Sequence, residues 1–168
     1  AAMMKAKAFD YLNKEALKEY RAIRKAEEEG VAVAERIAGR KAVTHIERVP
    51  SVVYTEPEIA WVGKTEDELK NAGKPYKVGV FPFMANGRAR AVGETQGFVK
   101  MLADAETDLV LGLHIIGPQA GELIAQGCDA LSFGATAEDL ALICDPHPTF
   151  SEAIKEAALA VNKEGINF

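Results

Sequence analysis

The sequence predicts an α+β domain: an antiparallel sheet of about four to six strands, packed with helices and preceded by a long N-terminal helix. Three observations predict this fold class. Apolar residues recur at helical spacing over residues 8–38, short β-type runs follow Pro50, and helical segments return after residue 117. The 168 residues, 48% of them apolar, suit one domain with a substantial core.

The N-terminal helix is expected over residues 8–38, with Gly39 as its stop. Its apolar residues recur at steps of three to five and form roughly one stripe: Phe9, Leu12, Leu17, Tyr20 and Ile23. A helix of this length is unusual in a small globular domain. Part of its surface is therefore expected to lie against something outside the domain.

The strands are expected after Pro50, in the runs 51–55, 59–63, 76–83, 97–104 and 109–116. The short turns between them favour an antiparallel meander. Between the second and third runs, a compact helix should begin at Thr65, close its capping box with Glu68 and end at Gly73. Residues 84–96 are expected to form a polar loop.

Helices are expected again at 117–134, 136–144 and 148–161, with two or three of them over one face of the sheet. Thr136 with Asp139 is expected to start the second of these helices. The first is apolar on nearly every side and should be largely buried. Its start, "GLHIIGPQAGELI", has two glycines where a strand meets a helix. That junction could bind an anion at the helix N-terminus, but its spacing favours a tight connecting turn.

Composition excludes several classes of function. A formal charge of −5 argues against a nucleic-acid-binding surface. No apolar segment is long enough to predict a membrane span, so we expect no membrane partner. The N-terminus shows no secretory pattern, so we expect a cytoplasmic protein with Cys128 and Cys144 as reduced thiols, Cys144 being buried. His45, His114 and His147 are scattered, which predicts no metal site.

The stretch "CDPHPTFSEA", residues 144–153, holds the strongest candidate for chemistry. His147 stands between two prolines, and the His147–Pro148 bond is a candidate for the cis form. Glu152 can reach back to the imidazole and select its tautomer, which would make His147 a general base near pH 7. Alternatively, Thr149 and Glu152 form a T-x-x-E capping box, and His147 only precedes a helix.

The segment "CDPHPTFSEAIKEAALAV" resembles the C-terminal end of dihydrolipoamide dehydrogenase, a flavoprotein disulfide reductase of the pyridine nucleotide-disulfide oxidoreductase family, whose signature is His-Pro-Thr-x-Ser-Glu. Other segments resemble that family's C-terminal interface (dimerisation) domain in the same order: "EEEGVAVAERIAG", "VPSVVYTEPEIAWVGKTEDELKNAG", "FPFMANGRARA", "GFVKMLAD", "ETDLVLGLHIIGPQAGELIAQG" and "FGATAEDLALIC". The resemblance covers about residues 25–161. We therefore divide the chain into a non-family helical extension, 1–24, and an interface domain, 25–168.

The resemblance implies a homodimer in which this domain makes most of the contact between subunits. It implies that His147 is the acid–base catalyst toward a substrate dithiol and that Glu152 hydrogen-bonds this histidine. It also implies a cis bond at Pro148, and an approach of His147 and Pro148 to the flavin and redox disulfide of the partner subunit.

The sequence also departs from the family. The Gly-rich FAD fingerprint, the CxxxxC redox pair and the nicotinamide domain are absent from these residues, so FAD and NAD are expected of the full-length family and no cofactor of this chain. Arg24 stands where the family has His. Asp145 and Pro146 replace a His-Ala pair, and Asp145 could alter the charge near His147.

Three hypotheses follow. The first is a stand-alone homodimerisation domain that carries the His147–Glu152 pair without flavin, NAD or redox disulfide. The second is a piece of an active dihydrolipoamide dehydrogenase, which converts dihydrolipoamide and NAD⁺ to lipoamide and NADH, with its other domains supplied separately. The third is an engineered oligomer with a rebuilt N-terminal helix.

Overall fold

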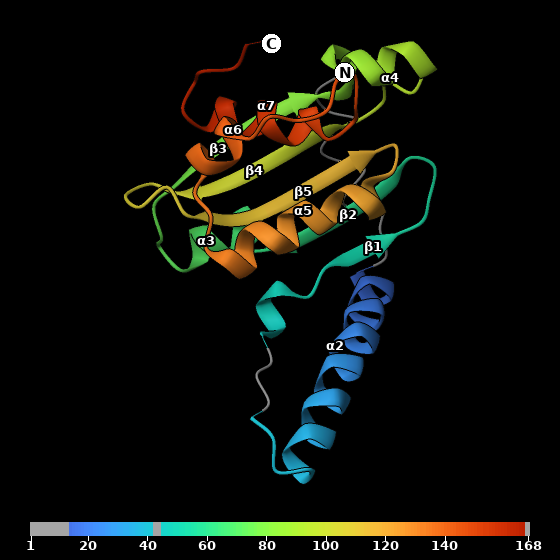
Figure 1. Cartoon of the computed structure of the whole chain (residues 1–168), viewed down its shortest axis with the longest axis vertical. Coiled ribbons are helices and arrows are strands. Elements are labelled where there is room, and N and C mark those ends of the chain that lie inside the picture. The colour runs from blue at the N-terminus through green and yellow to red at the C-terminus, as the bar shows by residue number, and fades with distance from the viewer. Residues whose placement is uncertain (1–13, 42–44, 167–168) are drawn as a thin grey trace.

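The computed structural model describes residues 14–41 and 45–166, and the predicted α+β class is confirmed. Figure 1 shows helix α2 (Lys14–Ile37) extending away from a body made of one sheet and the remaining helices. Gly39 follows the end of α2 with a φ of 72°. Phe9 and Leu12, at the predicted start of this helix, lie outside the described residues.

The sheet has five strands in the order β1-β2-β5-β4-β3, and every neighbouring pair is antiparallel. The strands are β1 (Ser51–Val53), β2 (Glu58–Gly63), β3 (Tyr76–Pro82), β4 (Phe98–Asp104) and β5 (Val110–Gly117). The predicted meander is right for β3, β4 and β5. It is wrong for β2, which pairs with β5, because the chain crosses to the far edge of the sheet before β3 begins.

One face of the sheet carries the helices, as predicted (Figure 1). Helix α5 (Ala120–Phe133) packs on β2 and β5, helix α7 (Glu152–Val161) packs on β3 and β4, and helix α6 (Ala137–Leu142) packs against α7. The main core lies between this face and the helices. Its largest fully buried apolar side chains are Phe83, Met101, Leu113, Ile115 and Ile154.

Two short helices begin as the sequence predicted. Helix α3 (Glu66–Asn71) has a complete capping box between Thr65 and Glu68, and α6 has the equivalent pair of Thr136 and Asp139. Each pair satisfies two backbone N–H groups at the helix start that no carbonyl of the helix can reach. None of the described helices combines the length and apolarity that crossing a bilayer requires.

The prediction of a loop over residues 84–96 is wrong. A 3₁₀ turn, η2 (Phe83–Ala85), leads into helix α4 (Gly87–Val92). The Asn86 side chain caps this helix by accepting a hydrogen bond from Ala89 N, and Gly93 ends it at a φ of 78°. The helix is only six residues long, too short for apolar periodicity to reveal it. Its cap and its glycine were the available signals.

Candidate active site

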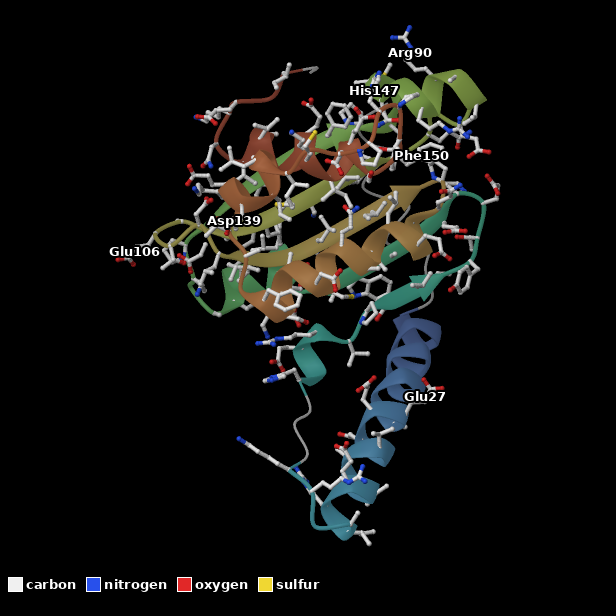
Figure 2. All side chains as sticks on the ribbon, in the orientation of Figure 1. Glu27, Arg90, Glu106, Asp139, His147 and Phe150 are labelled. Carbon is white, nitrogen blue, oxygen red and sulfur yellow. The ribbon has the colours of Figure 1, made fainter. Side chains whose placement is uncertain are left out.

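The loop that leads into α7 holds the candidate residues at one end of the molecule. Its His147–Pro148 peptide is cis. Phe150 is only 7% exposed and packs edge-on against Phe83, with 6.1 Å between ring centroids. In contrast, the His147 side chain is 76% exposed (Figure 2). Phe150 therefore anchors the loop in the core while the imidazole stays accessible.

Glu152, the first residue of α7, contacts the histidine and the loop backbone at once. Its Oε1 lies 2.8 Å from His147 Nδ1, and its Oε2 accepts a hydrogen bond from Thr149 N at 2.7 Å. The carboxylate therefore combines the histidine contact of the first alternative with one of the two hydrogen bonds of the capping box in the second. One oxygen of the carboxylate orients the imidazole while the other satisfies the backbone.

The Thr149 hydroxyl has a different role from the one that a full capping box gives it. It donates to Pro146 O at 2.7 Å and lies 2.8 Å from Ser151 Oγ. Helix α7 begins at Glu152, with Ser151 in the cap position and no side-chain cap. The predicted helix start at 148 is therefore wrong, because these side-chain contacts hold the residues before Glu152 in a separate turn.

The surroundings of Glu152 favour its ionised form. Burial opposes ionisation, but the hydrogen bonds from Thr149 N–H and from His147 outweigh it and hold the pKa of Glu152 below its usual range. An ionised carboxylate accepts the Nδ1–H of a neutral imidazole. This arrangement leaves the lone pair of His147 Nε2 free to take a proton, which is what a general base requires.

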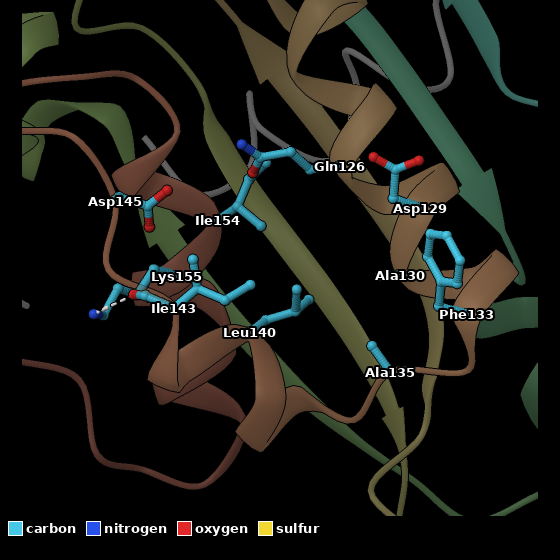
Figure 3. Close-up of a pocket in the computed structure, with 10 residues that line it drawn as sticks. All are labelled: Gln126, Asp129, Ala130, Phe133, Ala135, Leu140, Ile143, Asp145, Ile154 and Lys155. Atoms are coloured by element: carbon cyan, nitrogen blue, oxygen red, sulfur yellow. Dashed lines mark hydrogen bonds between the residues drawn. The ribbon is translucent and has the colours of Figure 1, made fainter.

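Asp145 lies in the wall of a cavity of about 280 Å³ between α5 and the start of α7 (Figure 3). Burial raises its pKa, and the nearby Lys155 and Ser151 oppose that rise. Lys155 Nζ donates to Ile143 O at 2.7 Å across the same wall. The exposed ring of Phe133 borders the cavity on the α5 side.

The other two histidines lie apart from this site. His45 is on the surface, with its Nδ1 3.3 Å from Glu47 Oε1. His114 is only 4% exposed, and burial together with the positive charge of Lys100 lowers its pKa to about 4, so it is neutral at pH 7. Among the side chains that the structure describes, those of residues 26–41, 45 and 47–166, no three His, Cys, Asp or Glu residues gather in a way that could hold a metal ion.

The two cysteines are free thiols. Burial raises the pKa of the half-buried Cys128, which makes its thiolate less available. The expectation that Cys144 is buried is wrong, because this residue is exposed. Helix α6 ends at Leu142, and the extended backbone of Ile143 leads the chain away from the apolar run.

The glycine-containing junction before α5 is a packed turn. A Cβ atom on Gly117 would lie 2.3 Å from the Phe83 ring, so only glycine fits. The N-terminus of α5 already has an anionic partner within the chain, since Gly121 N donates to Glu58 Oε2 at 2.9 Å. The tight-turn interpretation therefore accounts for this segment.

Asn86 is the residue near the site that the sequence analysis missed. It is 3% exposed, and its Nδ2 donates to Thr149 O at 2.9 Å while its Oδ1 caps α4. The available signal was an asparagine, followed by Gly87, before a run of helix-forming Arg and Ala residues. Nothing in the sequence linked it to a residue 63 positions away.

Comparison with known proteins gives one family match. Residues 49–158 match the model described as "Pyridine nucleotide-disulphide oxidoreductase, dimerisation domain". The chain is 59% identical over 143 residues to a dihydrolipoyl dehydrogenase of Cupriavidus necator, covering 85% of the chain and 30% of that protein. It is 57% identical over 136 residues to a mitochondrial dihydrolipoyl dehydrogenase of Caenorhabditis elegans, covering 81% of the chain and 28% of that protein.

A solved structure agrees with these matches. The crystal structure of LpdA from Mycobacterium tuberculosis superposes with a TM-score of 0.69 at 29% identity, over 74% of this chain and 27% of that one. The chain thus spans less than a third of the length of the relatives that it matches. Because one relative is mitochondrial by name, the expected cytoplasmic location stays a prediction.

Proposed function

Because this chain belongs to the dimerisation-domain family of the pyridine nucleotide-disulphide oxidoreductases, and to its dihydrolipoamide dehydrogenase type, we propose that it joins two subunits and supplies their acid–base pair. His147 is the acid–base catalyst, and Glu152 orients it. The observation that carries the proposal is the 2.8 Å contact between Glu152 Oε1 and His147 Nδ1 on a ring whose side chain is 76% exposed.

The chemistry of the pair follows from its geometry. Glu152 keeps the neutral imidazole in the Nδ1–H form, and Nε2 takes the proton from one thiol of the substrate dithiol. The resulting thiolate attacks a disulfide, and His147 later returns its proton to the departing sulfur. The reaction as a whole removes two electrons and two protons from the dithiol, which becomes a disulfide.

The His147 site is suited to a redox centre that other parts of the assembled protein supply. The Nε2 side of His147 is accessible, and neither cysteine of the chain is paired. When bound in the assembled protein, a flavin would supply the acceptor for this electron pair and the link to NAD⁺. We propose that residues 14–41 and 45–166 contribute the proton transfer and the subunit contact, and that other parts contribute the electron transfer.

We place part of the contact between subunits at the end of α5. Phe133 is 87% exposed and Ile143 is 51% exposed, and both border the cavity described above. Large exposed apolar side chains beside a hollow mark interaction surfaces. The apolar face of α7 is already covered by β3 and β4 within the chain. A second copy can therefore cover Phe133 and Ile143 without disturbing that packing.

We further propose the division into residues 1–24 and 25–168. Helix α2 runs unbroken across this boundary, and among its described side chains Ala32 is the one that is buried. A chain of residues 25–168 should therefore fold and self-associate as the whole chain does, as measured by circular dichroism and light scattering. Aggregation of the shortened chain would instead assign residues 1–24 to covering apolar surface.

A chimera tests the acid–base role. Residues 25–168 replace the equivalent segment of the Cupriavidus necator enzyme, whose sequence is 59% identical. We expect the chimera to oxidise dihydrolipoamide with NAD⁺, and His147→Gln to lower its kcat by about 10²–10⁴-fold, the usual contribution of general acid–base catalysis. Thermal stability should change little, because the ring is exposed.

His45→Gln is the matched control, since it removes another surface histidine with a glutamate neighbour. It should leave kcat unchanged. An active chimera in which His147→Gln retains full kcat contradicts the acid–base role. The chain by itself should be colourless and should form a dimer by light scattering. A yellow preparation that reduces NAD⁺ would support the second hypothesis, that the chain works within an active enzyme.

A further inference from the structure

We propose that Asn86 is a positioning residue that holds the His147–Glu152 pair in its working geometry, an inference that rests on the function proposed above. Asn86 lies between η2 and α4, far in sequence from the loop that carries the pair. It is 3% exposed, and both functional groups of its side-chain amide have partners. A buried amide with fixed partners on two segments ties those segments together.

Asn86 is connected to the His147–Glu152 pair through the backbone of Thr149. Asn86 Nδ2 donates to Thr149 O at 2.9 Å, and Thr149 N donates to Glu152 Oε2 at 2.7 Å. Thr149 is therefore held at its carbonyl by Asn86 and at its amide by Glu152. The other oxygen of that same carboxylate contacts His147 Nδ1. A movement of the Thr149 backbone would thus shift the carboxylate that selects the tautomer of the histidine.

The surroundings support this link. Phe83, three residues before Asn86, is fully buried and packs edge-on against Phe150, the residue after Thr149. An ideal Cβ atom built on Gly87 would lie 3.9 Å from His147 Cε1, so the start of α4 borders the imidazole directly. Two contacts, one polar and one aromatic, therefore fix the loop against the η2–α4 segment.

The competing account is that Asn86 only caps α4, by accepting from Ala89 N at 2.9 Å. Asn86→Ser separates the two accounts. Serine is as good a cap as asparagine, but its hydroxyl is too short to keep both partners. Asn86→Asp is the second variant, because it retains the volume and the cap yet has no N–H to donate when ionised. Thr65→Ala is the matched control for a cap lost far from the loop.

The test is ¹⁵N NMR of the His147 imidazole in the full chain at neutral pH. We expect Asn86→Ser and Asn86→Asp to lower the ratio of Nδ1–H to Nε2–H tautomer by about fivefold, the factor that corresponds to one lost hydrogen bond. The Ala89 amide should stay protected from exchange. Thr65→Ala should leave the tautomer ratio unchanged. An unchanged ratio in both Asn86 variants, with both folded, overturns the inference.

The same variants in the chimera separate this inference from the proposed function. A positioning role predicts a lower kcat with KM nearly unchanged in Asn86→Ser, alongside the altered tautomer ratio. If the ratio changes but kcat responds to neither Asn86 nor His147, the positioning inference holds and the proposed catalytic function fails. If substitution of His147 lowers kcat, while substitution of Asn86 changes neither the tautomer ratio nor kcat, the positioning inference fails and the proposed catalytic function holds.

Discussion

Gly79 of strand β3 lies directly against the backbone of helix α7 at Ala157. A Cβ atom on Gly79 would lie 2.0 Å from the carbonyl oxygen of Ala157 and 2.5 Å from the backbone nitrogen of Val161. Neither backbone atom can move aside as a flexible side chain could. This contact fixes the height of α7 above the sheet, and α7 carries Glu152 at its first position.

Gly79→Ala should therefore destabilise the fold. The added methyl group forces α7 away from β3, and overpacking of this kind costs about 2–3 kcal/mol in the free energy of unfolding. Urea denaturation measures the change. Gly30→Ala is the control, because nothing lies within 4 Å of a Cβ atom at that helical glycine, and alanine is the better helix former. Equal stabilities for wild type and Gly79→Ala would mean that α7 is free to shift.

The ion pair between α3 and β4 should make stability depend on acid pH. The Lys100 ammonium, 2.9 Å from Glu66 Oε1, is the main reason that the pKa of Glu66 falls to about 2 despite burial, and Tyr76 also donates to this carboxylate. A folded-state pKa below the unfolded value stabilises the fold above about pH 4.5, and the contribution is lost as the pH falls toward 2.

Lys100→Met removes the largest cause of that shift. We expect a loss of about 2 kcal/mol at pH 7. The deficit should shrink as the pH is lowered toward 3 in a series of urea titrations. Removing Lys100 also removes a positive charge that lowers the pKa of His114 in the folded state. Protonation of His114 at low pH then opposes folding less in the variant than in the wild type, which also makes the deficit shrink as the pH falls. Lys70→Met, at an exposed partner of the same carboxylate, should have a much smaller effect. A deficit that is constant with pH would assign the loss to packing.

Glu152→Gln should reverse the tautomer of His147. The glutamine oxygen can still accept from Thr149 N, but its NH₂ group then faces Nδ1 and donates to it. The imidazole would carry its proton on Nε2, and Nε2 could no longer act as a base. ¹⁵N NMR of the imidazole reports the switch directly, and the chimera should lose at least about 10²-fold in kcat. A variant that keeps the Nδ1–H form would contradict this role of the carboxylate.

The self-association proposed at the end of α5 can be tested by placing a charged side chain in the proposed contact. Phe133→Glu should shift the mass measured by sedimentation from dimer toward monomer, because it places a carboxylate in an apolar contact. Val92→Glu is a matched control, since Val92 and Phe133 are each the last residue of a helix before a left-handed glycine. A clean dimer in both variants would place the contact on another surface.

Only part of the site could be predicted from the sequence. The spacing of His147 and Glu152 predicted a contact because the two residues lie five positions apart on one turn and helix start. Asn86 was not found, since its partner is brought to it by the packing of Phe83 on Phe150. The choice between a base and a capped turn could not be settled either. Both oxygens of Glu152 are used, and only coordinates assign them separately.

The sequence by itself determined the α+β class, the strand and helix segments with strong periodicity, the caps at Thr65 and Thr136, and the resemblance that the family match supports. These features depend on neighbours within a few residues, where side-chain pattern and backbone preference act directly. Tertiary structure decided the place of β2 beside β5, the exposure of Cys144 and the link from Asn86 to Thr149. These three features depend on which distant segments pack together in the core. The burial of apolar area decides that packing, and no local sequence pattern records it.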